Sequence, residues 1–240
     1  MDLDAYGTFV SVDAHQPDAA FTVGLIANTQ YADAVDQSEP TGTRRFRQGL
    51  EVVKRAVAFW QQHAPLTFVA HLGNVLAAEN AAADAQWTAL QRYQEETVRC
   101  DCKQWHLAAG DQDLRCFGAG QMSALAPSRP TDGASYYSFS PSEGWRVLVL
   151  DAFCDSLLAH APGSAAHASA LERLRGANPN GASVPFPLVG LVGAARRWHP
   201  GGGGLGAVQM SWLRAQVFCF SPTHPFLPHV APPLFPDLTV

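Results

Sequence analysis

Three short apolar runs in the first half of the chain each end in a polar turn. They comprise residues 21–26 before Ala27-Asn28-Thr29-Gln30, residues 68–72 before Gly73-Asn74, and residues 105–109 before Gly110-Asp111-Gln112-Asp113. Apolar runs of this length and composition predict buried strands. Ligands and metals bind at the carboxyl ends of strands in α/β sheets. The three turns therefore predict a site, of the kind that holds two metal ions, at one edge of a sheet.

Helical spacing of apolar residues separates these runs. Residues 43–62 carry apolar side chains at three- and four-residue intervals, with Thr43 as the expected N-cap. Residues 81–99 predict a second helix. A strand over residues 66–72 completes a strand, helix, parallel strand unit with a right-handed crossover. The alternation predicts an α/β fold, and the arginine-rich residues 44–47 are interpreted as the solvated start of the first helix.

The pattern is less regular in the second half. Residues 121–135 predict a loop, residues 136–139 and 145–150 a hairpin, residues 159–175 a loop and a helix, and residues 209–217 a last helix. The glycine run at 201–206 is interpreted as the entry into that helix. We expect an N-terminal extension over residues 1–20, a single domain over 21–217 and an irregular proline-rich tail over 218–240.

Composition excludes several classes of function. The 240 residues are 47% apolar and 15% charged, which is typical of a globular protein. A net charge of −5 gives no electrostatic footprint for nucleic acid. No run predicts a transmembrane segment, and residues 1–20 lack the features of a secretory signal. The expected location is intracellular, cytoplasmic by default, with an organelle as the open alternative.

Residues 24–33 carry the first of several ordered landmarks, reading Gly-Leu-Ile-Ala-Asn-Thr-Gln-Tyr-Ala-Asp. The other landmarks are residues 44–47, 136–141, 147–151, 178–180, 203–206 and 209–213. In this order they resemble the calcineurin-like metallophosphoesterases, and within them the manganese-dependent ADP-ribose/CDP-alcohol diphosphatase group. The resemblance implies a metallophosphoesterase-like αββα sandwich, in which two mixed sheets pack between helices.

The motifs depart from that family at the positions that carry its chemistry. Asn28 and Asn74 stand where the family has metal-binding aspartates, Asp111 where it has an asparagine, and Gln112 where it has the catalytic histidine; Gln30 is retained. An asparagine offers one neutral oxygen, whereas a metal-bridging ligand needs two anionic ones. A glutamine has no proton to exchange near neutral pH. No catalytic residue is therefore assigned, and Asn28, Gln30, Asn74 and Asp111 form a degenerate metal site.

The family continues for about a hundred residues past the helix at 209–217, with a metal-ligand histidine and a Gly-His-x-His motif. This chain ends at Val240 and has no such motif. The resemblance thus implies a fold that lacks part of its second sheet. An exposed sheet edge and face favour association. We expect a protein partner, or a larger complex, to cover the incomplete sheet.

Three hypotheses follow for the function. The first is a pseudoenzyme, a catalytically inactive metallophosphoesterase-like protein that serves as a structural or interaction subunit and has no cofactor. The second is a metal-dependent phosphohydrolase acting on ADP-ribose or CDP-alcohols, with manganese or another divalent cation weakly bound. The third is a module that binds a nucleotide diphosphate without turnover.

Overall fold

The computed structural model describes residues 19–39, 42–63, 65–118, 121, 125, 135–182 and 188–218. The chain divides into two compact units, Met1–Ala152 and Phe153–Val240. The prediction of one domain over 21–217 stays a prediction, and most of the expected N-terminal extension and almost all of the tail lie outside the described residues.

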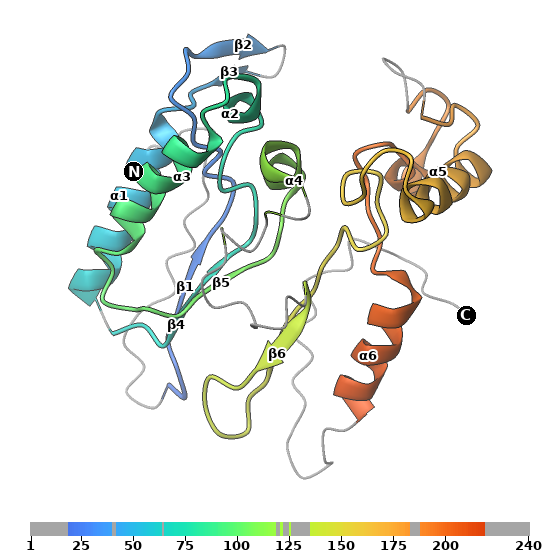
Figure 1. Cartoon of the computed structure of the whole chain (residues 1–240). Coiled ribbons are helices and arrows are strands. Elements are labelled where there is room, and N and C mark those ends of the chain that lie inside the picture. Colours follow the sequence, from blue (N-terminus) through green and yellow to red (C-terminus); the bar gives the residue numbers. More distant parts are fainter. Residues whose placement is uncertain are drawn as a thin grey trace. The chain divides into compact units, whose positions relative to one another are not determined.

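A parallel sheet forms the centre of the first unit (Figure 1). Its strands are β1 (Val23–Ile26), β4 (Phe68–His71) and β5 (Trp105–Leu107), in the order β1-β4-β5. Val23 is opposite Phe68, and Val69 is opposite Trp105. The three apolar runs thus form neighbouring strands that all point the same way, as the sequence predicts. Their following turns meet at one edge of the sheet.

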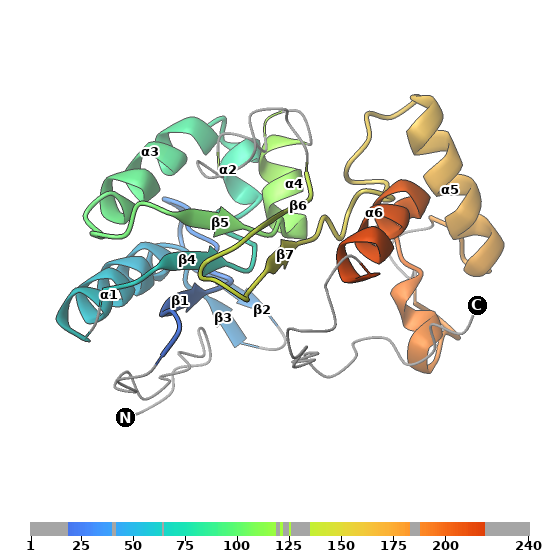
Figure 2. The ribbon, with the colours of Figure 1, turned by 90° about the horizontal axis from the view of Figure 1, so that it is seen from below.

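Helices α1 (Gln48–His63) and α3 (Gln86–Thr97) cover one face of this sheet (Figure 2). The apolar stripe of α1 buries Val53, Ala56, Val57 and Trp60. The predicted start of this helix at Thr43 is wrong. Gly42–Arg44 instead forms β3, which pairs with β2 (Gln37–Glu39) in an antiparallel hairpin, so Thr43 is a strand residue and cannot cap the helix.

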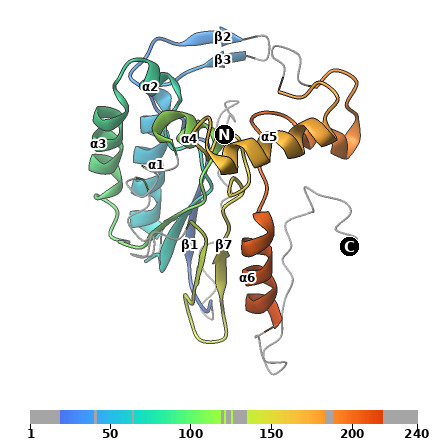
Figure 3. The same ribbon diagram turned by 45° about the vertical axis from the view of Figure 1, so that its right-hand side comes forward.

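The predicted helix over 81–99 is divided into two in the structure. The first part is α2 (Glu79–Ala82), and α3 follows after a short break. Asp84, in the break, has φ +50°, a left-handed conformation that interrupts a right-handed helix. The break separates α2 from the long helix, and α2 lies next to the β2–β3 hairpin (Figure 3).

The second hairpin is β6 (Tyr137–Phe139) with β7 (Val147–Val149), close to the predicted bounds. It lies on the sheet face opposite α1 and α3 (Figure 2). The Phe139 ring contacts the Phe68 ring edge to face, with 5.1 Å between the ring centroids, and stacks on the His106 ring, with 3.7 Å between the centroids. The first unit therefore has helices, a parallel sheet and a hairpin as successive layers. The remaining helix of this unit is α4 (Asp111–Phe117), which begins directly after the third turn.

The second unit contains α5 (Ala165–Ala177), a 3-10 helix η2 (Gly193–Arg197) and α6 (Gly206–Phe218), and α5 and α6 run in different directions (Figure 3). Ser164 caps α5, since its hydroxyl accepts a hydrogen bond from the His167 amide at 3.1 Å. The glycine run leads directly into α6, as the sequence predicts. No helix in the described ranges is long and apolar enough to span a membrane.

Candidate functional site

Backbone hydrogen bonds join the first two turns at the edge of the sheet. The amide of Asn28 donates to the carbonyl of Gly73 at 3.0 Å, that of Gln30 to Asn74 at 2.9 Å, and that of Tyr31 to Val75 at 3.1 Å. The turns after β1 and β4 are therefore fastened side by side. They bring the side chains of Asn28, Gln30 and Asn74 to one place, as their positions after parallel strands predict.

These three residues have a strained backbone. Asn28 has φ +53°, Gln30 +43° and Asn74 +57°. Left-handed conformations cost non-glycine residues about 1–3 kcal/mol each, and they gather at functional sites. Asparagine tolerates this region better than glutamine. The strain is held by the backbone hydrogen bonds between the turns.

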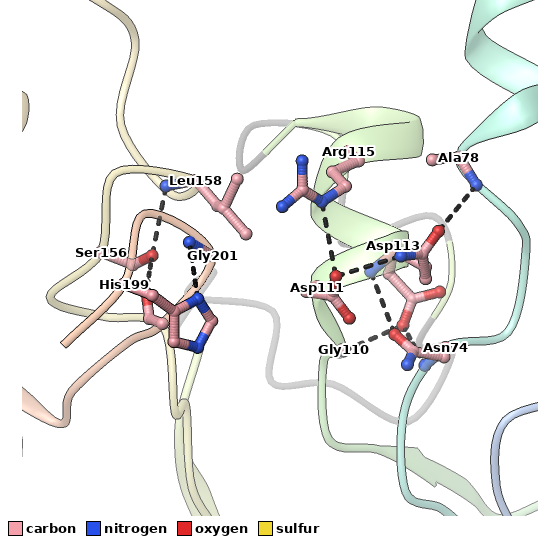
Figure 4. A network of polar contacts seen from close by, with 12 residues as sticks. Asn74, Ala78, Gly110, Asp111, Asp113, Arg115, Ser156, Leu158, His199 and Gly201 are labelled. Carbon is pink, nitrogen blue, oxygen red and sulfur yellow. Dashed lines mark hydrogen bonds and ion pairs between the residues drawn. The ribbon is translucent and has the colours of Figure 1, made fainter. Parts of the chain in front are cut away.

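Asp113 fastens the third turn to the second (Figure 4). Its carboxylate is 0% exposed and accepts hydrogen bonds from the amides of Asn74 at 2.8 Å, Val75 at 2.8 Å, Leu76 at 3.3 Å and Gly110 at 3.0 Å. Burial raises the pKa of Asp113 to about 6, against the lowering effect of these four donors. Every oxygen is committed to the backbone, so this carboxylate holds the loops and does not face a ligand.

The side chains of Asn28 and Asn74 bind each other. The Asn74 amide nitrogen Nδ2 donates to Asn28 Oδ1 at 2.8 Å, and Gln30 Nε2 lies 3.5 Å from the same oxygen. Asn74 Oδ1 accepts a hydrogen bond from the backbone amide of Gln112 at 3.0 Å. Two carboxylates facing each other would need a cation between them, whereas these amides satisfy one another without one.

An arginine occupies the side of this cluster. Arg44, the last residue of β3, donates to Gln30 Oε1 at 3.0 Å and to Glu79 at 2.9 Å. Its guanidinium lies 4.7 Å from the centre of the Phe46 ring. The interpretation of residues 44–47 as a solvated helix start is therefore wrong for Arg44, whose side chain is only partly exposed. Its positive charge lies against the one family ligand that the sequence retains.

Asp111 and Gln112 lie at the start of α4. Asp111 Oδ2 accepts hydrogen bonds from Gln112 Nε2 at 3.1 Å and from Arg115 at 3.4 Å. Gln112 Oε1 accepts from the backbone amide of Ala78 at 3.3 Å. Figure 4 shows Asp111 beside Arg115 and the Asn74–Asp113 cluster. The side chain that replaces the family's histidine is thus used to tie α4 to the segment before α2.

Gly110 is required where α4 meets the second turn. A Cβ atom there would lie 2.0 Å from Asn74 Oδ1 and 2.5 Å from the Asn74 backbone nitrogen. Non-bonded atoms do not approach this closely, so a side chain at position 110 would displace Asn74. The close approach keeps Asn74 Oδ1 within reach of the Gln112 amide.

Two histidines near the sheet end are buried and bonded. His71 Nδ1 accepts from the Gly73 amide at 3.1 Å, and its Nε2 lies 3.4 Å from the Thr29 hydroxyl. His106 Nδ1 lies 2.9 Å from the Tyr137 hydroxyl. Burial lowers the pKa of His71 to about 3 and that of His106 to about 4. Both rings are neutral at pH 7 and serve the packing of the layers.

The second unit has a smaller polar cluster of its own. Ser156 Oγ donates to the Gly202 carbonyl at 2.7 Å and accepts from the Leu158 amide at 3.2 Å, while His199 Nδ1 accepts from the Gly201 amide at 3.2 Å (Figure 4). A Cβ at Gly202 would lie 2.6 Å from the Arg197 carbonyl oxygen. These contacts shape the turn that precedes α6.

The residues present do not fit a pair of divalent cations. No group of three or more histidine, cysteine or acidic side chains within the described ranges is placed to hold a metal ion. The converging side chains are neutral amides whose oxygens already accept hydrogen bonds, and the cation of Arg44 is bonded directly to one of them, Gln30. Manganese prefers anionic oxygens and imidazole. The site is therefore an amide and guanidinium cluster.

The structural roles of two residues of this site, Arg44 and Asp113, were not predicted from the sequence. Arg44 reaches the cluster from the β2–β3 hairpin, and no spacing signal marks that approach. Asp113 accepts the Gly110 amide at 3.0 Å from the first turn of α4, which is one half of a capping box. Glycine has no side chain to form the other half, so the sequence does not mark this role. The assignment of Asn28, Gln30, Asn74 and Asp111 as a weak metal site stays a prediction.

Comparison with known proteins identifies relatives. No family model matches the chain. It is 32% identical over 204 residues to a manganese-dependent ADP-ribose/CDP-alcohol diphosphatase from Oryza sativa subsp. japonica, covering 84% of this chain and 62% of that protein. A protein of the same name from Arabidopsis thaliana is 32% identical over 201 residues, covering 83% of this chain and 63% of the relative.

A solved structure shares the fold. The crystal structure of a dimetal phosphatase from Danio rerio superposes with a TM-score of 0.75 at 28% identity, covering 84% of this chain and 66% of that one. The expected metallophosphoesterase-like α/β fold is confirmed. The chain spans a little under two thirds of the length of these relatives.

Proposed function

Because this chain belongs to the metallophosphoesterase family, we propose that it retains the family's fold and loop geometry without two-metal hydrolysis. It then works as a structural or interaction protein within a larger assembly. The observation that carries this proposal is the direct hydrogen bond from Asn74 Nδ2 to Asn28 Oδ1 at 2.8 Å. The two side chains at the family's metal-binding aspartate positions thus bind each other.

Charge supports the same conclusion. A dication at this place would sit beside Arg44 and would have to displace it from Gln30 Oε1. It would meet neutral oxygens where a manganese centre uses carboxylates. The nearest carboxylates are committed elsewhere, Asp113 to four backbone amides and Asp111 to Gln112 and Arg115.

Proton transfer is also unsupported by the described side chains. Gln112 has no titratable proton near neutral pH, and its oxygen accepts the Ala78 amide. His71 is fully engaged by Gly73 and Thr29, and His106 is bonded to Tyr137. Neither Gln112 nor either of these two histidines is therefore placed to protonate a leaving group at the cluster.

Exposed apolar side chains in the first unit support the interaction role. Leu25 on β1 is 45% exposed, Leu72 after β4 is 59% exposed and Trp145 before β7 is 45% exposed. Large apolar residues that remain in water favour association with another protein surface.

The test compares the unmodified chain with a variant that carries Asn28→Asp, Asn74→Asp and Gln112→His. Hydrolysis of ADP-ribose is followed with increasing manganese, and manganese affinity is measured on both proteins. We expect no manganese-stimulated turnover by the unmodified chain and at least tenfold tighter manganese binding by the variant. Metal-stimulated turnover by the unmodified chain would contradict the proposal.

A second candidate is a metal-dependent phosphohydrolase, and the names of the relatives support it more directly than the first. The left-handed backbone at Asn28, Gln30 and Asn74 supports it as well, because that geometry aims side chains at one point. One divalent cation, such as manganese, would be held by Gln30, Asn74 and Asp111. Asp111→Ala should then abolish metal-stimulated hydrolysis of ADP-ribose or a CDP-alcohol. Saturable ADP-ribose binding without turnover would favour instead a nucleotide-binding module.

A further inference from the structure

A hollow between the end of β1 and the first turns of α1 is lined by three arginines. Arg44, Arg45 and Arg55 share the lining with Asn28, Gln30 and Val52, and none of the residues that line it in the described ranges is acidic. Gly49, also in the lining, lets α1 pack closely against the first turn, because a Cβ there would lie 2.0 Å from the Thr29 carbonyl oxygen. The floor is the contact of α1 with the first turn.

Two of the three arginines have no carboxylate partner among the residues that the structure describes. Arg44 is engaged with Gln30 and Glu79. Arg45 and Arg55 are exposed, and neither forms an ion pair with a carboxylate of the described ranges. Nearby Arg47 and Lys54 do have carboxylate partners, Asp33 and Glu51. Unpaired guanidinium groups around one hollow make it attractive to anions.

The amides at the start of α1 are not the source of this attraction. The backbone amides of Gln48, Gly49 and Leu50 already donate to the carbonyls of Arg45, Phe46 and Arg47. The positive charge of the hollow therefore comes from side chains. Guanidinium groups bind phosphoryl oxygens through paired hydrogen bonds, and several cations around one hollow favour an anion with more than one negative charge.

We propose that the hollow lined by Arg45 and Arg55 binds the phosphoryl group of a small phosphorylated molecule without a metal ion. Arg45 and Arg55 provide the charge, and the Asn28 side chain adds a neutral polar group to the lining. The hollow borders the amide cluster and shares Asn28, Gln30 and Arg44 with it. The charge that the proposal uses comes from Arg45 and Arg55, which are not part of that cluster, so the proposal does not depend on whether the cluster hydrolyses anything. In this proposal, arginine side chains bind the phosphoryl group and no metal ion is needed.

Calorimetric titration of the whole chain with inorganic phosphate and with pyrophosphate, in the presence of EDTA, tests the proposal. Malonate is titrated as a carboxylate dianion. Arg45→Gln and Arg55→Gln remove the proposed contacts, and Arg99→Gln removes an equal charge from an exposed side chain just after α3. Because the substituted side chains are all exposed, the folds should be unchanged, and thermal unfolding of each variant checks this.

We expect saturable binding of pyrophosphate in EDTA, weakened about tenfold or more by Arg45→Gln and by Arg55→Gln and less than about twofold by Arg99→Gln. Binding should also weaken as salt is raised. The proposal is overturned by no binding at millimolar pyrophosphate, by equal weakening in all three variants, or by malonate binding as tightly as pyrophosphate. Manganese-dependent turnover in a parallel assay would contradict the proposed function and leave this site intact.

Discussion

Replacing Asp113 by alanine should be the most damaging single change at the sheet edge. The side chain is 0% exposed and accepts four backbone amides from two segments, those of Asn74, Val75, Leu76 and Gly110. An unsatisfied buried donor costs about 1–3 kcal/mol. Some of the four will find water in the space that the carboxylate leaves. We expect the free energy of unfolding to fall by about 4 kcal/mol.

Asp111→Ala is the matched control, because it removes the same group two residues away on the same helix. The Asp111 side chain is 35% exposed and its charged partner is Arg115, 3.4 Å away on the surface. Exposed pairs of this kind contribute about 0–1 kcal/mol. Urea unfolding at pH 7, followed by tryptophan fluorescence, measures both variants. Amide hydrogen exchange at Val75 and Leu76 shows where the loss occurs, since both amides should lose protection only in Asp113→Ala. A loss below about 1 kcal/mol, or equal losses in the two variants, would refute the assigned role of Asp113.

Three further predictions concern the same turns. Gly110→Ala should lower the free energy of unfolding by about 1–3 kcal/mol, because its Cβ would lie 2.0 Å from Asn74 Oδ1. Gly176→Ala, within α5 and with open space around its Cβ position, should be neutral or stabilising in the same urea assay. The double change Asn28→Asp with Asn74→Asp places two carboxylates where Asn74 Nδ2 and Asn28 Oδ1 are now 2.8 Å apart, and should lower the free energy of unfolding by about 1–2 kcal/mol. Added manganese should restore this stability in a thermal-shift assay, and no recovery with metal would contradict the prediction. Burial raises the pKa of the Asp113 carboxyl to about 6 from an ordinary 3.8, so the folded state holds this proton more tightly than the unfolded chain. The resulting stabilisation is fully present below pH 3.8 and is lost as the pH rises through about 6, a change of about 3 kcal/mol in the free energy of unfolding. Unfolding experiments over this pH range measure it, and Asp113→Asn should abolish the pH dependence.

The parts of the fold that could be predicted are those set by local pattern. The short apolar runs located β1, β4 and β5, and apolar residues at three- and four-residue intervals located the body of α1. The start of α1 was misplaced because Thr43 resembles a cap by type, while pairing of β3 with β2 decides its conformation. The break at Asp84 was also missed, since it depends on one left-handed residue, and the alanine-rich sequence around it favours a continuous helix.

The site was predictable in position but not in its contacts. The rule that ligands bind at the carboxyl ends of parallel strands correctly brought Asn28 and Asn74 together. It could not show that their amides bind each other, because that depends on side-chain rotation. The approach of Arg44 depends on how the β2–β3 hairpin folds back toward Gln30, which is a tertiary contact without a sequence signal.

The most direct test of the account is the stoichiometry of manganese bound to the purified, unmodified chain. Equilibrium dialysis with manganese analysis measures it, with ADP-ribose hydrolysis followed on the same samples. We expect less than one ion per chain at micromolar manganese and no turnover, because the amides of Asn28 and Asn74 satisfy each other and Arg44 lies against Gln30. Two tightly bound ions with turnover would contradict the central claim and would establish the second candidate function.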